Sequence, residues 1–217
     1  MKLNGKKVCF LGDSITEGAC ASATEKCYVS LFAAAHPEAE VLNLGIGGTR
    51  IAKQTKPSGN ERWDRDFVLR ADEIPADTDL ICVFGGTNDW GHGDAPLGSF
   101  GDTANDTFYG ALYALSMKLI EKNPLARIVF FTPLHRITES DFHQKPDGDH
   151  LLSEYIDAVR KNAEYFSFPV LDLYAMSGIQ PKVPALCAAY TADGLHPNDA
   201  GYEKLFRIID GYIANLV

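Results

Sequence analysis

The sequence predicts an α/β fold in which a five-stranded parallel sheet lies between two layers of helices. Five short apolar runs recur along the chain, at residues 7–11, 41–44, 80–84, 127–132 and 169–173. Such runs are typical of strands buried on both faces, and the stretches between them are long enough for right-handed helical crossovers. We therefore expect a flavodoxin-like three-layer α/β/α sandwich, with residues 1–217 in a single domain.

Three of the intervening stretches carry apolar residues at steps of three and four, which predicts amphipathic helices. They span residues 107–122, 150–166 and 198–216, and Asn198 is the expected N-cap of the last. Residues 90–106 and 134–149 lack this periodicity. Because both follow strand ends, we expect them at one edge of the sheet, as pocket walls or as lids.

Composition excludes some classes of partner. The chain has 20 Lys and Arg against 29 Asp and Glu, a formal net charge of −9, which argues against nucleic acid. No run is as long as the roughly 18 apolar residues of a membrane span, and no secretory signal is visible. The 5 cysteines are odd in number, which favours reduced thiols over a disulfide framework. We expect a cytoplasmic protein; its oligomeric state is left open.

The segment Gly12-Asp13-Ser14-Ile15-Thr16 directly follows the first predicted strand. Open α/β sheets bind ligands beyond the carboxyl ends of their strands, so Ser14 stands where chemistry is expected. Two interpretations are open for this residue. It could cap a helix, with Glu17 completing a capping box, or it could be a nucleophile.

A serine nucleophile needs a base, and the base needs a group that fixes its tautomer. The segment Asp193-Gly194-Leu195-His196-Pro197 supplies both within one turn. A carboxylate three residues before an imidazole can reach Nδ1 and leave Nε2 directed elsewhere. A histidine in a loop is more often simply solvated, so this pair carries weight only together with Ser14.

Hydrogen-bond donors for a developing oxyanion would complete such a site. After the second strand comes Asn43-Leu44-Gly45-Ile46-Gly47-Gly48, whose glycines let backbone N–H groups turn toward a ligand. After the third comes Gly85-Gly86-Thr87-Asn88-Asp89, which places a side-chain amide on the same edge. Taken singly, these segments could be an ordinary turn and an Asx cap.

Together the four segments resemble the SGNH hydrolases, also called the GDSL esterase and lipase family. The resemblance runs from Gly12 to Pro197 and keeps the order of the family's motifs, with Ile15 where the family name has leucine. It implies a catalytic triad of Ser14, His196 and Asp193. It also implies an oxyanion hole made by the N–H groups of Ser14 and Gly48 and the Asn88 amide; Gly47 is adjacent, but Gly48 fits the Asn-x-Gly-x-x-Gly spacing.

Competing motifs are missing from the sequence. There is no Gly-x-Ser-x-Gly elbow, no Ser-x-x-Lys, no phosphate-binding Gly-x-x-x-x-Gly-Lys and no dinucleotide fingerprint. Neither Cys-x-x-Cys nor His-Glu-x-x-His occurs, and His135, His143 and His150 are scattered. We expect no cofactor and no metal.

These observations predict a serine esterase that works through an acyl-enzyme. The small, polar segment around Trp90 and His92 favours short acyl groups, such as acetyl, on polar or carbohydrate alcohols. Asp13, Trp90 and His92 are the expected pocket residues, although Trp90 could equally be a packing residue. The resemblance equally allows a lysophospholipase or a thioesterase. From a different class, a non-catalytic flavodoxin-like module could bind a phosphate at residues 12–16 and would have no use for Asp193 and His196.

Overall fold

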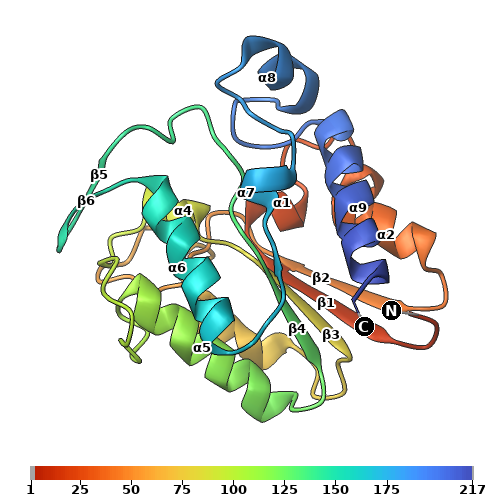
Figure 1. Ribbon diagram of the computed structural model, residues 1–217, viewed down its shortest axis with the longest axis horizontal. Helices are drawn as coiled ribbons and strands as arrows, with labels where there is room; N and C mark the ends of the chain where they lie inside the picture. Colours follow the sequence, from red (N-terminus) through yellow and green to blue (C-terminus); the bar gives the residue numbers. More distant parts are fainter. Residues whose placement is uncertain (1–2, 217) are drawn as a thin grey trace.

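A computed structural model describes residues 3–216, in which five parallel strands form the central sheet (Figure 1). The strand order is β2-β1-β3-β4-β7. The strands are β1 (Lys7–Gly12), β2 (Glu40–Gly45), β3 (Leu80–Phe84), β4 (Arg127–Phe131) and β7 (Val170–Leu171). The predicted α/β class and the flavodoxin-like five-stranded parallel sheet are confirmed, although the last strand is shorter than expected because a helix begins at Leu173.

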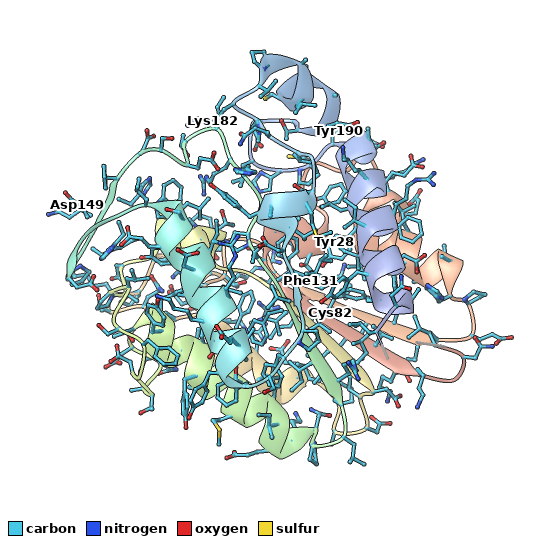
Figure 2. The ribbon with its side chains drawn as sticks, viewed as in Figure 1. Tyr28, Cys82, Phe131, Asp149, Lys182 and Tyr190 are labelled. Atoms are coloured by element: carbon cyan, nitrogen blue, oxygen red, sulfur yellow. The ribbon has the colours of Figure 1, made fainter. Side chains whose placement is uncertain are left out.

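Both faces of the sheet are buried, which explains the continuous apolar runs in the sequence. In β1, Val8 and Phe10 pack into one core cluster, whereas Cys9 and Leu11 pack into the other. The first cluster lies under α2 (Tyr28–Ala35) and α9 (Asp199–Ala214), and it contains Tyr28, Cys82 and Phe131, which are labelled in Figure 2. The second lies under α3 (Phe67–Arg70), α5 (Phe108–Lys122) and α6 (Leu152–Tyr165). Figure 1 shows these two helical layers.

The three helices predicted from periodicity are present as α5, α6 and α9. Thr107 caps α5 through the N–H of Gly110, and Asn198 caps α9 as predicted, through the N–H of Gly201. The sequence analysis did not identify α2. That helix is apolar on nearly every side, so it lacks the alternation of apolar and polar residues on which the prediction depends.

Short helices occupy the connections. They are α1 (Ser14–Glu17), α4 (Thr87–Gly91), α7 (Leu173–Met176) and α8 (Pro184–Tyr190), with 3₁₀ turns at Thr24–Lys26 and Ala71–Glu73. None of the helices in residues 3–216 combines the length and apolar character needed to cross a bilayer.

Residues 134–149 are not wholly irregular, contrary to expectation. They contribute to a two-stranded hairpin of β5 (His143–Lys145) and β6 (Gly148–His150), which projects beside α6 and carries Asp149 in its second strand (Figures 1 and 2). The hairpin is tied to the body of the protein, because Lys145 Nζ donates a 2.8 Å hydrogen bond to the Asp89 carbonyl. Polar residues and a very short turn gave no strand signal in the sequence.

The register of the sheet brings the functional segments together. Gly12 at the end of β1 pairs with Gly45 of β2 on one side and with Phe84 of β3 on the other. The chain segments that follow these strands therefore begin at neighbouring points on one edge. Between β1 and β3 the connections leave in opposite directions, which is where doubly wound sheets bind their ligands.

Candidate active site

Ser14 and His196 form a hydrogen bond although they lie 182 residues apart in the chain. Ser14 Oγ and His196 Nε2 are separated by 2.9 Å. On the other side of the ring, His196 Nδ1 is 2.7 Å from Asp193 Oδ2. This chain of contacts joins a hydroxyl, an imidazole and a carboxylate in the order required for nucleophilic catalysis.

The loop that carries Asp193 and His196 is organised by its own backbone. Asp193 Oδ1 accepts hydrogen bonds from the N–H groups of Leu195 at 3.0 Å and His196 at 2.7 Å. Partial burial alone would raise the pKa of Asp193, but the hydrogen bonds from the His196 ring and from these two N–H groups outweigh it and lower the pKa. The carboxylate is therefore charged at neutral pH and can stabilise a protonated imidazole.

Ser14 begins α1 but does not cap it. The N-cap is Asp13, whose Oδ1 accepts a 3.0 Å hydrogen bond from the Ile15 N–H. Glu17 does not complete a capping box, because its carboxylate accepts from the Gly47 N–H at 2.7 Å and from Arg62. The capping interpretation of Ser14 is wrong, and its hydroxyl is free to engage His196.

The Asp13 side chain is buried and does not lie along an open pocket. It is only 1% exposed, and its Oδ2 has no hydrogen-bond partner among residues 3–216. Burial raises the pKa of Asp13 to about 6, against the opposing effects of the Ile15 N–H and the charge of His196. The expected role of Asp13 in lining a pocket does not fit this burial.

The three expected oxyanion donors belong to segments that follow the neighbouring strands β1, β2 and β3. Gly48 adopts a φ of +77°, a conformation that favours glycine. The N–H of Gly47 donates to the Glu17 carboxylate. The N–H groups of Gly48 and Ser14 donate to no acceptor within residues 3–216. Asn88 is 6% exposed, and its Nδ2 donates one hydrogen to the Thr49 carbonyl at 3.0 Å, which leaves the other available. Gly48 therefore fits the donor role better than Gly47.

Two buried charged residues that the sequence analysis missed hold this part of the site. Asp89 accepts hydrogen bonds from the N–H groups of Ile51 at 3.0 Å and Ala52 at 2.9 Å, and burial raises its pKa to about 6. Arg70, which is 0% exposed, donates to the Gly12 carbonyl at 3.1 Å and the Thr49 hydroxyl at 2.9 Å, and also to the Leu44 carbonyl. Arg70 thus ties the ends of β1 and β2 to the loop after Gly48.

Trp90 is a packing residue in this structure. It is 0% exposed, its Nε1 donates to the His150 carbonyl at 3.1 Å, and its ring lies 4.8 Å from the Arg136 guanidinium carbon. Of the two interpretations of Trp90, the packing residue fits this burial and the pocket residue does not. The residues around Trp90 in the sequence do not distinguish a core tryptophan from one that faces a ligand.

His92 is exposed beside the glycine loop, as a pocket residue would be. Its ring packs 5.4 Å from that of Trp63, and its Nδ1 lies 3.4 Å from Arg50 Nη1. Desolvation of the ring, followed by the positive charges of Arg50, Lys145 and Arg136, lowers the pKa of His92 to about 4. His92 is therefore neutral at physiological pH and can both donate and accept hydrogen bonds.

Trp63 is the exposed aromatic residue that the sequence analysis expected at position 90. It is 39% exposed, and a Cβ on Gly48 would come within 2.4 Å of its ring. The Trp63 ring therefore lies directly against the glycine that presents an oxyanion donor. Nothing in the sequence around Trp63 marks it as functional, since it lies in a polar stretch far from the four motifs.

Comparison with known proteins identifies the family of the chain. The model of the GDSL-like lipase/acylhydrolase family matches residues 10–204, which include all four motifs. The chain belongs to this family. The family is one of acylhydrolases, and the structure has the SGNH-hydrolase fold. None of the curated proteins compared with the chain matches it.

Several solved structures share the fold. A protein from Lactobacillus plantarum is 30% identical over 100% of both chains, with a TM-score of 0.83. A protein assigned as a GDSL-like lipase from Bacteroides uniformis is 20% identical, covers 97% of this chain and 96% of its own, and has a TM-score of 0.70. A two-domain esterase active on acetylated mannans is 21% identical over 96% of this chain and 48% of its own, with a TM-score of 0.63.

Proposed function

We propose that this acylhydrolase is a serine esterase that works through an acyl-enzyme. The observation that carries the proposal is the continuous set of hydrogen bonds from Ser14 through His196 to Asp193. A serine that served only to cap a helix would need neither partner. A phosphate-binding module built on residues 12–16 would likewise leave Asp193 and His196 without a role.

The reaction follows from these contacts. His196 Nε2 takes the proton of Ser14 Oγ as the oxygen attacks the acyl carbonyl, and Asp193 stabilises the imidazolium that forms. His196 then returns the proton to the leaving alcohol, which leaves the acyl group on Ser14. A water molecule, activated by the same imidazole, attacks the acyl-enzyme and releases the acid and the free serine.

The negative charge that develops on the carbonyl oxygen would be met by the N–H groups of Ser14 and Gly48 and by the Asn88 amide. Asp89 and Arg70 support this function by fixing the loop after Gly48 in one conformation. Donors that are already oriented need no reorganisation during the reaction, which is why they lower the barrier.

For the substrate we propose short acyl esters, of the acetyl type, on carbohydrate or other polar alcohols. Trp63 offers an exposed aromatic face beside Gly48, and neutral His92 offers hydrogen bonds next to it. An aromatic face and a few polar groups suit a sugar ring better than a long alkyl chain. The fold neighbour active on acetylated mannans is consistent with this class.

The proposal also takes residues 1–217 as one catalytic domain, supported by the two core clusters that share a single sheet. We further propose that it works in the cytoplasm, supported by cysteines that are all unpaired in the structure.

The test is hydrolysis of a series of activated esters from two to twelve carbons, by the wild-type protein and by Ser14→Ala. We expect the highest kcat/KM at two to four carbons and a loss of at least about 10⁴-fold in Ser14→Ala, as in other serine hydrolases that lose the nucleophile. Undiminished turnover in Ser14→Ala would contradict the mechanism. A maximum at eight or more carbons would contradict the short-acyl class and favour a lysophospholipase.

A further inference from the structure

A thiol stands beside the proposed triad. Within residues 3–216, Cys20, Asp193 and His196 are the one group of side chains whose metal-ligating atoms all lie within 4.8 Å of one another. Cys20 and Asp193 are exposed, and the His196 side chain is 19% exposed. An ion in solution can therefore reach all three residues without any unfolding.

The loop that carries Cys20 is anchored on both sides of this residue, at Ala19 and at Ser22. The carbonyl of Ala19 accepts a 2.7 Å hydrogen bond from the hydroxyl of Tyr202, a residue of α9 that is 0% exposed. Two residues beyond Cys20, the N–H and the hydroxyl of Ser22 donate to Asp199 at 2.8 and 2.6 Å. Both anchors belong to α9, which follows directly after the loop of Asp193 and His196.

The Asp193 carboxylate and the Cys20 thiol keep lone pairs that could bind a cation. Asp193 Oδ2 accepts only the hydrogen bond from His196, so one of its lone pairs remains, and the side chain of Asp193 is 47% exposed. Among the described residues, Cys20 forms no hydrogen bond with another side chain or with the backbone. Its pKa is raised by partial burial and by the charge of Asp193, so the thiol is protonated at neutral pH until a ligand displaces the proton.

We propose that Cys20, Asp193 and His196 bind a thiophilic divalent cation of the Zn²⁺ type, and that this binding inhibits the enzyme. Sulfur, imidazole nitrogen and carboxylate oxygen are the ligands that Zn²⁺ takes in proteins, and three protein ligands plus one water complete its usual tetrahedron. Binding would release the thiol proton to solvent and place the cation between a thiolate and a carboxylate.

Inhibition is expected because His196 and Asp193 belong both to the cation site and to the proposed triad. This part of the inference rests on the proposed function. A ring nitrogen of His196 that ligates a cation cannot also complete the proton transfer between Ser14 and Asp193. The Asp193 carboxylate would be drawn to the cation instead of to the imidazole. Substrate turnover and cation binding would thus exclude each other.

The first experiment is a Zn²⁺ titration of ester hydrolysis with three proteins, each compared with its own rate without metal. Cys20→Ser removes the thiol in question, and Cys187→Ser removes the other cysteine that is not buried. Changes next to a metal ligand typically weaken binding 10–100-fold, so loss of a ligand should raise the inhibitory Zn²⁺ concentration at least about tenfold. We expect this rise for Cys20→Ser and no change for Cys187→Ser. Equal sensitivity of all three proteins would overturn the proposal.

A second experiment does not depend on esterase activity. Co²⁺ bound through a thiolate gives a charge-transfer absorption band, which we expect when Co²⁺ is added to Ser14→Ala and which should be lost in the double variant Ser14→Ala/Cys20→Ser. Absence of the band in folded Ser14→Ala would overturn the site. If the band is present but the wild-type protein hydrolyses no ester, then the proposed function fails while the cation site stands.

Discussion

The two sides of the candidate site differ in how they are held. On the oxyanion side, Asp13, Arg70, Asn88 and Asp89 are between 0% and 6% exposed, and they bind backbone groups of the loops around them. On the base side, Asp193 is half exposed and belongs to a single turn that carries His196. The structure thus combines a buried, multiply connected frame with an accessible acid and base.

This difference indicates that the two sides have different structural requirements. Stabilisation of an oxyanion depends on donors that are already oriented in a site without water, and burial supplies that condition. The acid and base need only a short chain of hydrogen bonds, which one turn can provide at the surface. The base side is therefore also where solvent ions can interfere, as the thiol of Cys20 indicates.

The largest effect on the oxyanion side is expected for Asn88→Ala. Removal of one oxyanion donor typically lowers turnover about 10²–10³-fold, or roughly 3–4 kcal/mol. We expect that loss in kcat on an activated acetate ester, while circular dichroism shows the fold retained. Wild-type turnover in Asn88→Ala would show that the buried amide has only a structural role, through its hydrogen bond to Thr49.

Arg70→Met tests whether the buried residues on the oxyanion side depend on the Arg70 guanidinium for their stability. The change leaves the carbonyls of Gly12 and Leu44 and the hydroxyl of Thr49 without this donor. A buried polar group without a partner costs about 1–3 kcal/mol, and the Gly12 carbonyl keeps the hydrogen bond from the Ile46 N–H, so we expect a loss of about 3 kcal/mol in the free energy of unfolding, measured in urea.

Arg62→Met is the matched control for Arg70→Met. Arg62 pairs with Glu17 at the surface, where its side chain is 64% exposed. Surface ion pairs contribute about 0–1 kcal/mol, so its loss should be small. Similar losses in the two variants would mean that burial does not distinguish these arginines, and the description of a rigid frame would be wrong.

Asp13→Asn gives the smallest of the three effects and depends on pH. In the folded protein the pKa of Asp13 is about 6, above its ordinary value of 3.8, so the folded state keeps this proton to a higher pH than the unfolded state. The wild-type protein therefore loses stability through Asp13 as pH rises from about 4 to 7, and Asp13→Asn does not.

Thermal unfolding at several pH values measures this effect. The stability of Asp13→Asn relative to wild type should improve by about 2 kcal/mol between pH 4 and pH 7, at about 1.4 kcal/mol per pKa unit. A difference that stays constant over this range would show that Asp13 is already charged in the folded protein at pH 4.

Much of the fold could be predicted because it depends on local patterns. The apolar runs of β1 and β3 and the periodic faces of α5 and α9 are explicit in the sequence. Helix α2 and the β5–β6 hairpin lack such patterns, since one is apolar throughout and the other is short and polar. Their conformations depend on tertiary contacts, such as the packing of α2 in the core and the hydrogen bond from Lys145 to Asp89.

The residues proposed for chemistry were accessible to sequence reasoning because they lie in motifs that directly follow strands. Ser14, Asn88 and His196 are examples. The supporting residues were not, because Arg70, Trp63 and Cys20 take their roles from contacts with distant segments. For Trp90 the sequence left a pocket role and a packing role open, and only its burial in the folded protein favours packing.

The central claim is that Ser14 is a nucleophile activated by His196. Reaction of the folded protein with a fluorophosphonate, followed by peptide mass spectrometry, tests it directly, because such probes phosphonylate an activated serine. We predict modification at Ser14 alone in the wild-type protein and much slower modification in His196→Ala. A folded wild-type protein that stays unmodified, or that is modified at another residue, would contradict the claim.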